Sequence, residues 1–356
     1  MTFGIDIVKD AYVQPSPSFP SKPLNAGVFD SDGNVIVKAL HVGPSSSQNK
    51  PIYKEMESEY IDSAIFGGFL FTPHFGHIIT ESLGRLWAID SIDKTIEKIV
   101  FFPGFSHLKI PSYFHELMVK LGVDKRVLLV ENAMQVGRLF VPDQLFGLGP
   151  LIGAHPKFIE FSKGLISSAR LGVSPGKKIY VSRSNYKVER GGVVCEPILE
   201  ENLKRAGYEI VFPEKMSITE QIEVYMSAEI LLFSEGSALH FYGLMAQPSQ
   251  KVGILVTRHN GWVFKKQVQA FSGVEPVTIK CHKKYLIPKQ HDWPMANSGT
   301  LLDYSMLKKE LVEAGFISAD LMLREPSASE INEHQRIFEA SHKAGAAWSD
   351  ELKALS

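Results

Sequence analysis

Several features that mark common protein classes are scarce or absent in this sequence. It has only two cysteines, Cys195 and Cys281, which lack both zinc-site spacing and the density of a disulfide framework, so we expect a reducing compartment. No apolar run reaches about 18 residues, and Asp and Lys stand where a signal peptide has its apolar core. These absences predict a cytoplasmic protein without a membrane-spanning helix.

An excess of one charge is also missing. The 38 Lys and Arg residues balance 39 Asp and Glu residues, which gives no electrostatic reason to expect a nucleic-acid partner. The chain opens with no G-x-G-x-x-G motif, which argues against a dehydrogenase or an epimerase. With 356 residues, of which 44% are hydrophobic, the sequence is typical of a globular protein with two domains.

The first half of the chain changes character near residue 60. Residues 1–60 hold clusters of Pro, Ser, Gly and Asn around short strand-like runs, which predicts an irregular, partly β segment with little chemistry. Residues 61–172 alternate strand and helix patterns, so we expect a parallel sheet with covering helices. One of these helices is predicted over 73–90, capped by Thr72 and with Pro73 at its first position.

The second half repeats the alternation more regularly. Residues 173–290 read as a compact βαβαβαβ unit of Rossmann-like type, with one helix closed by Gly207 and the next opened by a capping box from Ser217 to Glu220. Residues 291–356 are polar with scattered apolar positions. This pattern predicts a helical segment that packs back on the body.

The stretch HFGHIITESLGRLW, at 74–87, concentrates chemistry on one predicted helix. His77, Glu81 and Arg85 fall at i, i+4 and i+8, so Glu81 can hold the imidazole tautomer or share its proton, as general acid–base catalysis requires. The same residues can instead form a solvated, mutually paired helix face. His74, His77 and Glu81 also offer three metal-ligand groups, but no second ligand cluster accompanies them, so we expect no metal.

A second stretch, LLFSEGSALHFYG at 231–243, joins a strand directly to a helix. Gly236 would let a ligand approach the backbone, and the amides at the helix start would attract an anion. Ser237 could donate its hydroxyl and Glu235 could accept from ribose hydroxyls, while His240 would face the same crevice or the sheet. Such a junction is also often no more than a tight turn.

A third stretch, IYVSRSNYKVERGG at 179–192, places cations after another strand. Arg183, Lys187 and Arg190 follow the carboxyl end of that strand, and guanidinium groups suit phosphate oxygens. A solvated basic loop would show the same residues. These cations and the turn at Glu235 are expected at the same edge of the sheet, and this favours a diphosphate site.

Together these segments resemble family 61 glycosyltransferases over most of residues 60–260. The matching pieces, in the order of the family, are HFGHIITESLGRLW, IYVSRS, GYEIVFPEKMSITEQIEVYMSAEILLFSEGSALH and KVGIL. The Glu-Gly-Ser-Ala-Leu-His form at 235–240 resembles the bacterial, capsular-polysaccharide branch. The sequence departs from the family at Cys195-Glu196, where relatives often show Asn-Glu, so no donor contact is assigned to Cys195.

The resemblance implies an α/β fold of GT-B type, in which two Rossmann-like domains face each other across a cleft. It also implies an inverting transferase that moves a sugar from a nucleotide sugar, with a UDP-sugar first among the donors, to an oligosaccharide or lipid-linked saccharide. The expected setting is bacterial capsule, lipopolysaccharide or exopolysaccharide biosynthesis. No cofactor or metal is expected, because cationic side chains can stabilise the leaving diphosphate.

We assign residue roles within this framework from the position and spacing of the residues in the predicted elements. His77 is the expected base, with Glu81 orienting it or taking that role itself, and His74 and Arg85 are expected on the acceptor side. The expected donor residues are Arg183, Lys187, Arg190, Glu235, Gly236, Ser237 and His240.

Two other functions stay open at this point. A catalytically inactive member could bind a nucleotide sugar or glycan as a scaffold of a polysaccharide assembly complex, and another nucleotide-dependent Rossmann enzyme would share the second α/β unit. Binding without turnover would establish the first of these. Peripheral contact with the inner face of the membrane, homo-oligomerisation and the linkage formed are left undecided by the sequence.

Overall fold

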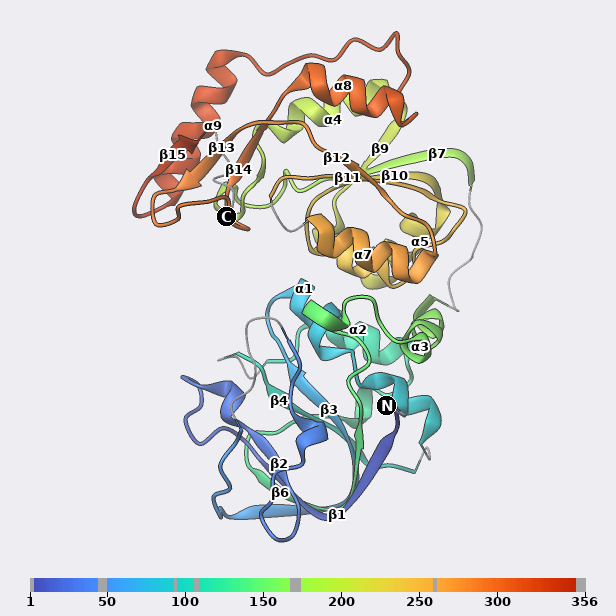
Figure 1. The fold of residues 1–356 in the computed structure, drawn as a ribbon, viewed down its shortest axis with the longest axis vertical. Helices are drawn as coiled ribbons and strands as arrows, with labels where there is room; N and C mark the ends of the chain where they lie inside the picture. The colour runs from blue at the N-terminus through green and yellow to red at the C-terminus, as the bar shows by residue number, and fades with distance from the viewer. Residues whose placement is uncertain are drawn as a thin grey trace. The chain divides into compact units, whose positions relative to one another are not determined.

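The computed structural model describes residues 3–43, 50–92, 95–105, 109–166, 174–258 and 261–349. The chain divides into two compact units, Met1–Ser168 and Ala169–Ser356, and each has its own sheets (Figure 1). Within the described ranges, no helix combines the length and apolar character that a membrane span requires. The mixed α/β class expected from the sequence, with parallel sheets, is confirmed.

The first unit is built on a six-stranded mixed sheet in the order β2-β1-β6-β3-β4-β5. Strands β6, β3, β4 and β5 are parallel neighbours, and β1 and β2 add to one side in antiparallel pairs. The strands are β1 (Ile5–Gln14), β2 (Gly27–Phe29), β3 (Ser58–Leu70), β4 (Lys98–Pro103), β5 (Val127–Leu129) and β6 (Ala133–Pro142). Buried aromatic residues such as Phe66, Phe69 and Phe102 fill the core around β3 and β4.

Strand β1 is longer than the sequence indicates. The sequence pattern predicts only short strand-like runs before residue 60, yet β1 pairs with β6 from Ile5 opposite Pro142 to Val13 opposite Met134. Charged residues at Asp6, Lys9 and Asp10 obscure the strand pattern. The strand forms through backbone pairing with β6, and only its second half is buried.

The helix predicted over 73–90 is wrong as a single element. His74, not Thr72, is the N-cap residue, and the chain forms a short α-helix α1 (Phe75–His77), a π-helix η3 (Ile78–Ser82) and a separate 3-10 helix η4 (Leu86–Ser91). Gly84 explains the interruption: a Cβ there would overlap the backbone oxygen of Phe146, and its own carbonyl accepts from the amide of Leu145 at 2.9 Å. Tertiary pairing therefore replaces the helical hydrogen bonds.

The other helices of this unit cover the sheet as the pattern indicated. Helices α2 (Ser112–Lys120) and α3 (Pro156–Ile166) belong to the strand–helix alternation predicted for residues 61–172, of which residues 167–172 lie outside the described ranges. Short 3-10 turns are η1 (Pro23–Asn25), η2 (Val37–Ala39), η5 (Asp124–Arg126) and η6 (Gly149–Leu151).

The second unit contains a fully parallel five-stranded sheet in the order β12-β11-β10-β7-β9. The strands are β7 (Ser174–Val181), β9 (Tyr208–Val211), β10 (Ala228–Ser234), β11 (Lys251–Leu255) and β12 (Val277–Ile279). From β7 the chain passes to β9 on one side and then returns to β10 on the other. This reversal leaves a crevice between the carboxyl ends of β7 and β10, where ligands bind in open α/β sheets.

Helices cover both faces of this sheet. Figure 1 shows α4 and α8 on one face and α5 and α7 on the other. The helices are α4 (Glu196–Arg205), α5 (Ile218–Ser227), α6 (Ser237–Gly243), α7 (Gly261–Ser272), α8 (Tyr304–Glu313) and α9 (Ala328–Ser341), with the 3-10 turns η7 (Val188–Arg190) and η8 (Pro213–Lys215). Gly207 takes a φ of +83°, and the Ser217–Glu220 capping box is present, as predicted.

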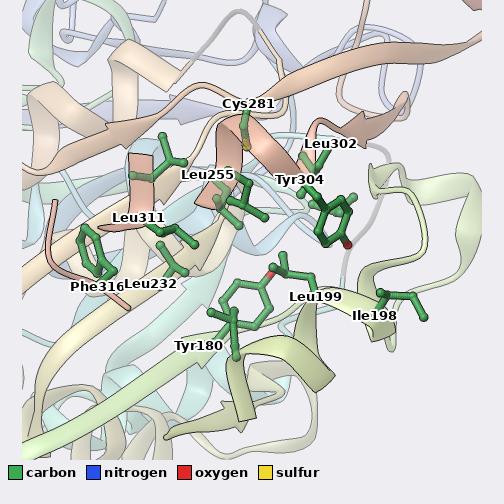
Figure 2. Packing of buried hydrophobic residues seen from close by; sticks show 14 of the residues in the cluster. Tyr180, Ile198, Leu199, Leu232, Leu255, Cys281, Leu302, Tyr304, Leu311 and Phe316 are labelled. Carbon is green, nitrogen blue, oxygen red and sulfur yellow. The ribbon is translucent and has the colours of Figure 1, made fainter. Parts of the chain in front are cut away.

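The core beneath α4 and α8 joins residues from distant parts of the sequence (Figure 2). Tyr180 and Leu232 from the sheet pack with Leu199 of α4 and with Leu311 of α8. Burial of such side chains contributes roughly 1.5–3 kcal/mol each. This packing holds α4 against the end of β7, where Arg183 follows the strand.

A small third sheet was not expected from the sequence. Residues 291–356 were predicted to be helical, but β14 (Gly299–Leu302) and β15 (Ala346–Ser349) pair with β13 (His282–Pro288), and β8 (Gly192–Val193) joins parallel to β14. Helices α8 and α9 do lie within this segment, so the prediction holds for those parts alone. β13 and β14 are consecutive along the chain, whereas β8 and β15 join them from distant parts of the sequence.

Candidate active site

A histidine and a glutamate are paired where β3 ends. His77 closes α1 and Glu81 lies in the π-helix η3, with Nδ1 of His77 3.1 Å from Oε2 of Glu81. The His77 side chain is 42% exposed while that of Glu81 is 5% exposed. A carboxylate accepts hydrogen bonds, so this pairing places a proton on Nδ1 and leaves Nε2 as the basic atom. Wide π-turns of this kind are frequent at functional sites.

The other two predicted residues of this stretch have different surroundings. Arg85 is buried, and its guanidinium donates to the backbone oxygens of Pro142 and Leu40, the latter at 2.9 Å. Burial lowers the pKa of Arg85 to about 10, so the group stays charged at neutral pH. Arg85 thus cross-links backbone segments, whereas His74 is exposed with its ring 5.8 Å from that of His77.

A third histidine, His41, is buried near this pair and was not among the residues predicted from the sequence. His41 is 6% exposed and packs its ring 5.0 Å from Phe71 and 6.0 Å from Phe69. Burial lowers the pKa of His41 to about 4, although the negative charge of Glu81 opposes this effect and the charges of Arg85 and His77 add to it. His41 is therefore a neutral imidazole at physiological pH.

The buried His41 predicts a specific dependence of stability on pH. An unfolded histidine has a pKa near 6.5, so between pH 6.5 and 4 the unfolded state binds more protons and the free energy of unfolding falls as the pH falls. The total loss attributable to His41 approaches about 3 kcal/mol below pH 4. Urea unfolding of the wild type and His41→Phe across this range should show the loss in the wild type alone. Parallel curves would contradict the prediction.

In the second unit, two predicted residues meet at the crevice between β7 and β10. Arg183 follows β7 and Gly236 follows β10, and a Cβ at Gly236 would overlap Nη1 of Arg183. Nη2 of Arg183 lies 3.4 Å from the backbone oxygen of Arg190. Nε is buried without a hydrogen-bond partner, and no carboxylate of the described residues forms an ion pair with the group. Such a guanidinium is available to an anion.

Two buried carboxylates on α4 hold the loop that carries Arg183. Glu196 accepts from the Tyr180 hydroxyl at 2.6 Å and from the Arg183 amide at 3.1 Å, and Glu200 one turn later accepts from Ser182 at 2.7 Å. Burial raises the pKa of both Glu196 and Tyr180. The two glutamates therefore fix the backbone at the end of β7 and leave the Arg183 guanidinium directed elsewhere.

Glu235 has a different environment from the one expected. Its side chain is fully buried, and Oε2 accepts from the amides of Thr257 at 2.9 Å and Arg258 at 3.1 Å. Oε1 lies 3.4 Å from Nε of Arg258. Both oxygens are thus engaged by the loop after β11, and Glu235 holds a second arginine near the crevice. Burial lowers the pKa of Arg183, and the neighbouring charge of Arg258 lowers it further.

The remaining predicted donor residues are scattered around this crevice. His240 is buried, with Nδ1 2.7 Å from Oε1 of Gln267, and so belongs to the packing between α6 and α7. Lys187 is 83% exposed beside Glu189, and Arg190 is exposed on the same loop. Ser237 is half-buried at the first position of α6.

These arrangements define a class of protein. A parallel sheet with two arginines at its strand-order reversal is suited to a phosphorylated ligand, and the histidine–carboxylate pair is suited to proton transfer. Among the described ranges, no group of three or more His, Cys, Asp and Glu side chains could hold a metal ion. The geometry is therefore that of an α/β protein with chemical groups suited to an anionic ligand and to proton transfer.

Comparison with known families makes the assignment specific. The model of the family described as Glycosyltransferase 61 matches residues 75–252, which is half of the chain. The protein belongs to this family, as the sequence motifs indicated, and its substrates are a sugar donor and an acceptor. No curated protein matches the sequence. His77, Glu81, Arg183 and Gly236 lie inside the matched range, whereas His41 and Arg258 lie outside it.

Two residues near the site, Arg258 and His41, were not predicted from the sequence, and only Arg258 follows a sequence pattern that could have identified it. Arg258 follows the strand KVGIL by three positions, and the rule that singled out Arg183 after its own strand would also have found it. His41 sits among Pro, Ser and Gly in an irregular segment and has no local pattern. Its proximity to Glu81 arises only from tertiary contacts.

Proposed function

We propose that this glycosyltransferase is an inverting, metal-independent enzyme that uses a nucleotide sugar, with a UDP-sugar as the first candidate. The observation that carries the donor site is the Arg183 guanidinium lying on Gly236 at the crevice between β7 and β10. Arg258 adds a second guanidinium nearby. Two cations can offset the charge that develops on a leaving diphosphate, which is the task that a metal ion would otherwise perform.

The proposed reaction is a single displacement. The acceptor hydroxyl gives its proton to Nε2 of His77 while its oxygen bonds to the anomeric carbon of the donor sugar. The bond from that carbon to the phosphate oxygen breaks, and the nucleoside diphosphate leaves with the bonding electrons. We assign the base to His77 because its side chain is 42% exposed, whereas Glu81 at 5% is placed to hold the Nδ1 proton.

The other donor-side roles are proposed in the same frame. Glu235 positions Arg258 instead of meeting a ribose, because both of its oxygens already have partners. Ser237 contacts the phosphate, and the exposed Lys187 and Arg190 contribute positive charge around it. His240 supports α6 from the buried side and does not touch the nucleotide.

On the acceptor side, exposed His74 contributes contacts to a saccharide, and Arg85 acts through the backbone segments that it joins. We propose an oligosaccharide or lipid-linked acceptor in bacterial capsule, lipopolysaccharide or exopolysaccharide assembly, at the cytoplasmic face of the membrane. A GT-B arrangement would bring base and donor together, and the proposal draws support from the separate α/β units, each with polar residues at strand ends.

Calorimetric titration with UDP, GDP, CMP and NAD, each with and without EDTA, tests the donor site. We expect one sugar-carrier nucleotide to bind with micromolar affinity, unchanged by EDTA. Binding of NAD alone, or of none of the four, would contradict the donor-site assignment. Tight nucleotide binding without transfer to any acceptor would instead favour a scaffold function.

A further inference from the structure

The loop that carries Arg258 is held by hydrogen bonds to one buried carboxylate. Beyond β11, the amides of Thr257 and Arg258 both donate to Oε2 of Glu235, at 2.9 and 3.1 Å. The side chain of Arg258 donates through Nε to Oε1 of the same carboxylate at 3.4 Å. The position of the Arg258 guanidinium is therefore tied to the backbone position of this loop.

The carbonyl group of Thr257 has its own partner, Thr300, from a later part of the chain. Thr300 lies in β14 and is fully buried, and its Oγ1 donates to the backbone oxygen of Thr257 at 2.7 Å. Thr300 is opposite Tyr285 of β13 on one side of β14 and opposite Val193 of β8 on the other. Because strands fix its backbone on both sides and a β-branched side chain has few rotamers, Thr300 presents its hydroxyl in a defined place.

Strand β14 also supports the loop that carries Arg183. Nη2 of Arg183 lies 3.4 Å from the backbone oxygen of Arg190, and two residues later the amide of Gly192 donates to the oxygen of Ser298 at 3.1 Å. Ser298 directly precedes β14, and Gly192 begins β8, which pairs with β14. One strand is thus bonded to both loops that bring an arginine to the crevice.

We propose that Thr300 is a positioning residue of the donor site, whose hydroxyl fixes the Thr257–Arg258 loop and so holds the Arg258 guanidinium at the crevice for a diphosphate. Thr300 lies outside the residues matched by the family model, which end at 252. The inference rests on the proposed function only for the diphosphate. Whether Thr300 holds the loop can be measured without any nucleotide.

The first test is hydrogen–deuterium exchange of the full chain without nucleotide, followed by NMR at the amides of Thr257 and Arg258. Thr300→Val keeps the shape of the side chain and removes only the donor. We expect exchange at both amides to quicken by about 2- to 12-fold, the effect of one neutral hydrogen bond. Amides of β11, which pair with β10 and β12, should keep the wild-type rate. Unchanged exchange at the two loop amides would overturn the proposal.

The second test is calorimetric titration with UDP, or with GDP if that is the diphosphate that binds. Thr300→Val should weaken binding by about 2- to 12-fold in the wild-type chain and in Arg183→Ala. In Arg258→Ala the same substitution should cause no further loss, because the group that Thr300 positions is already gone. A merely structural role would weaken binding by the same factor in both backgrounds, and that result would overturn the proposal.

Conservative and matched variants complete the experiment. Thr300→Ser keeps the hydroxyl and should restore both exchange and affinity. Thr278→Val makes the same substitution on β12, beside β11, and should leave both unchanged. Equal effects of Thr278→Val and Thr300→Val would contradict the proposal. Thr300→Cys, with a weakly donating thiol, replaces Thr300→Val in both tests if that variant does not fold.

The two tests separate this inference from the proposed function. A wild-type chain that binds no nucleotide would contradict the proposed donor site, and the exchange result alone would then decide whether Thr300 holds the loop. A wild-type chain that binds the diphosphate and loses affinity in Arg258→Ala, but not in Thr300→Val, would retain the donor site and exclude Thr300 as a positioning residue.

Discussion

His77→Ala is expected to lower turnover by about 10²- to 10⁴-fold, the usual contribution of a positioned general base. The reason is the loss of Nε2, which in the proposed reaction takes the acceptor proton while Glu81 holds Nδ1 at 3.1 Å. Glu81→Gln should lower turnover less, because an amide can still accept from Nδ1 but does not stabilise the imidazolium that forms. The measurement is release of nucleoside diphosphate from the donor identified by calorimetry.

The controls for this prediction separate chemistry from binding. Nucleotide affinity in His77→Ala should match that of the wild type, because all of the proposed donor residues belong to the second unit. His74→Ala removes an exposed ring 5.8 Å from His77 and should affect KM for the acceptor more than kcat. Wild-type turnover in His77→Ala would exclude it as the base and transfer that role to Glu81.

Arg183→Ala is expected to weaken nucleoside diphosphate binding by roughly 10- to 150-fold, which corresponds to about 1.5–3 kcal/mol for hydrogen bonds to a charged group. The guanidinium has a buried Nε without a partner and lies at the reversal of strand order, so little of its bonding is used within the described part of the chain. Calorimetry with the diphosphate and with the matching nucleoside measures the effect. Only the diphosphate should lose affinity.

A matched variant tests whether the position of the guanidinium matters as well as its charge. Gly236→Ala keeps Arg183 but places a methyl group where Nη1 lies, and the flexible side chain must move while the fold is retained. We expect a loss of diphosphate affinity that approaches that of Arg183→Ala. Lys187→Ala, at a side chain 83% exposed, should change affinity by no more than about twofold. Equal losses for nucleoside and diphosphate in Arg183→Ala would refute the phosphate role.

Much of the second unit was predictable because its signals are local. Four strands and three helices follow apolar runs and caps that can be seen in the sequence, and the Ser217–Glu220 box and Gly207 mark helix ends through their own backbone geometry. The chemistry of Arg183 and Gly236 was also visible, because both follow strands that end at the same edge of a parallel sheet. The small third sheet was not predicted, since β8 and β15 pair with strands that are distant in the sequence.

The pairing of His77 with Glu81 near the end of β3 was predicted correctly, but the single helix on which that prediction rested does not form. The prediction that His77, Glu81 and Arg85 share one face required one continuous helix. Close packing at Gly84 instead ends the helical structure before Arg85. His77 and Glu81 remain paired because the α-turn and π-turn between them still bring positions four apart together. Arg85 instead becomes a buried link between two backbone segments.

The sequence by itself determined the family, the alternation of strands and helices, and the chemical groups that stand at strand ends. These properties depend on neighbours within a few residues, where backbone geometry and hydrophobic period act directly. Only the tertiary structure decided that Arg258 is held by Glu235 and that His41 is buried near Glu81. Such contacts form when sheet order and core packing close long loops, and no short-range pattern encodes which distant side chains then become neighbours.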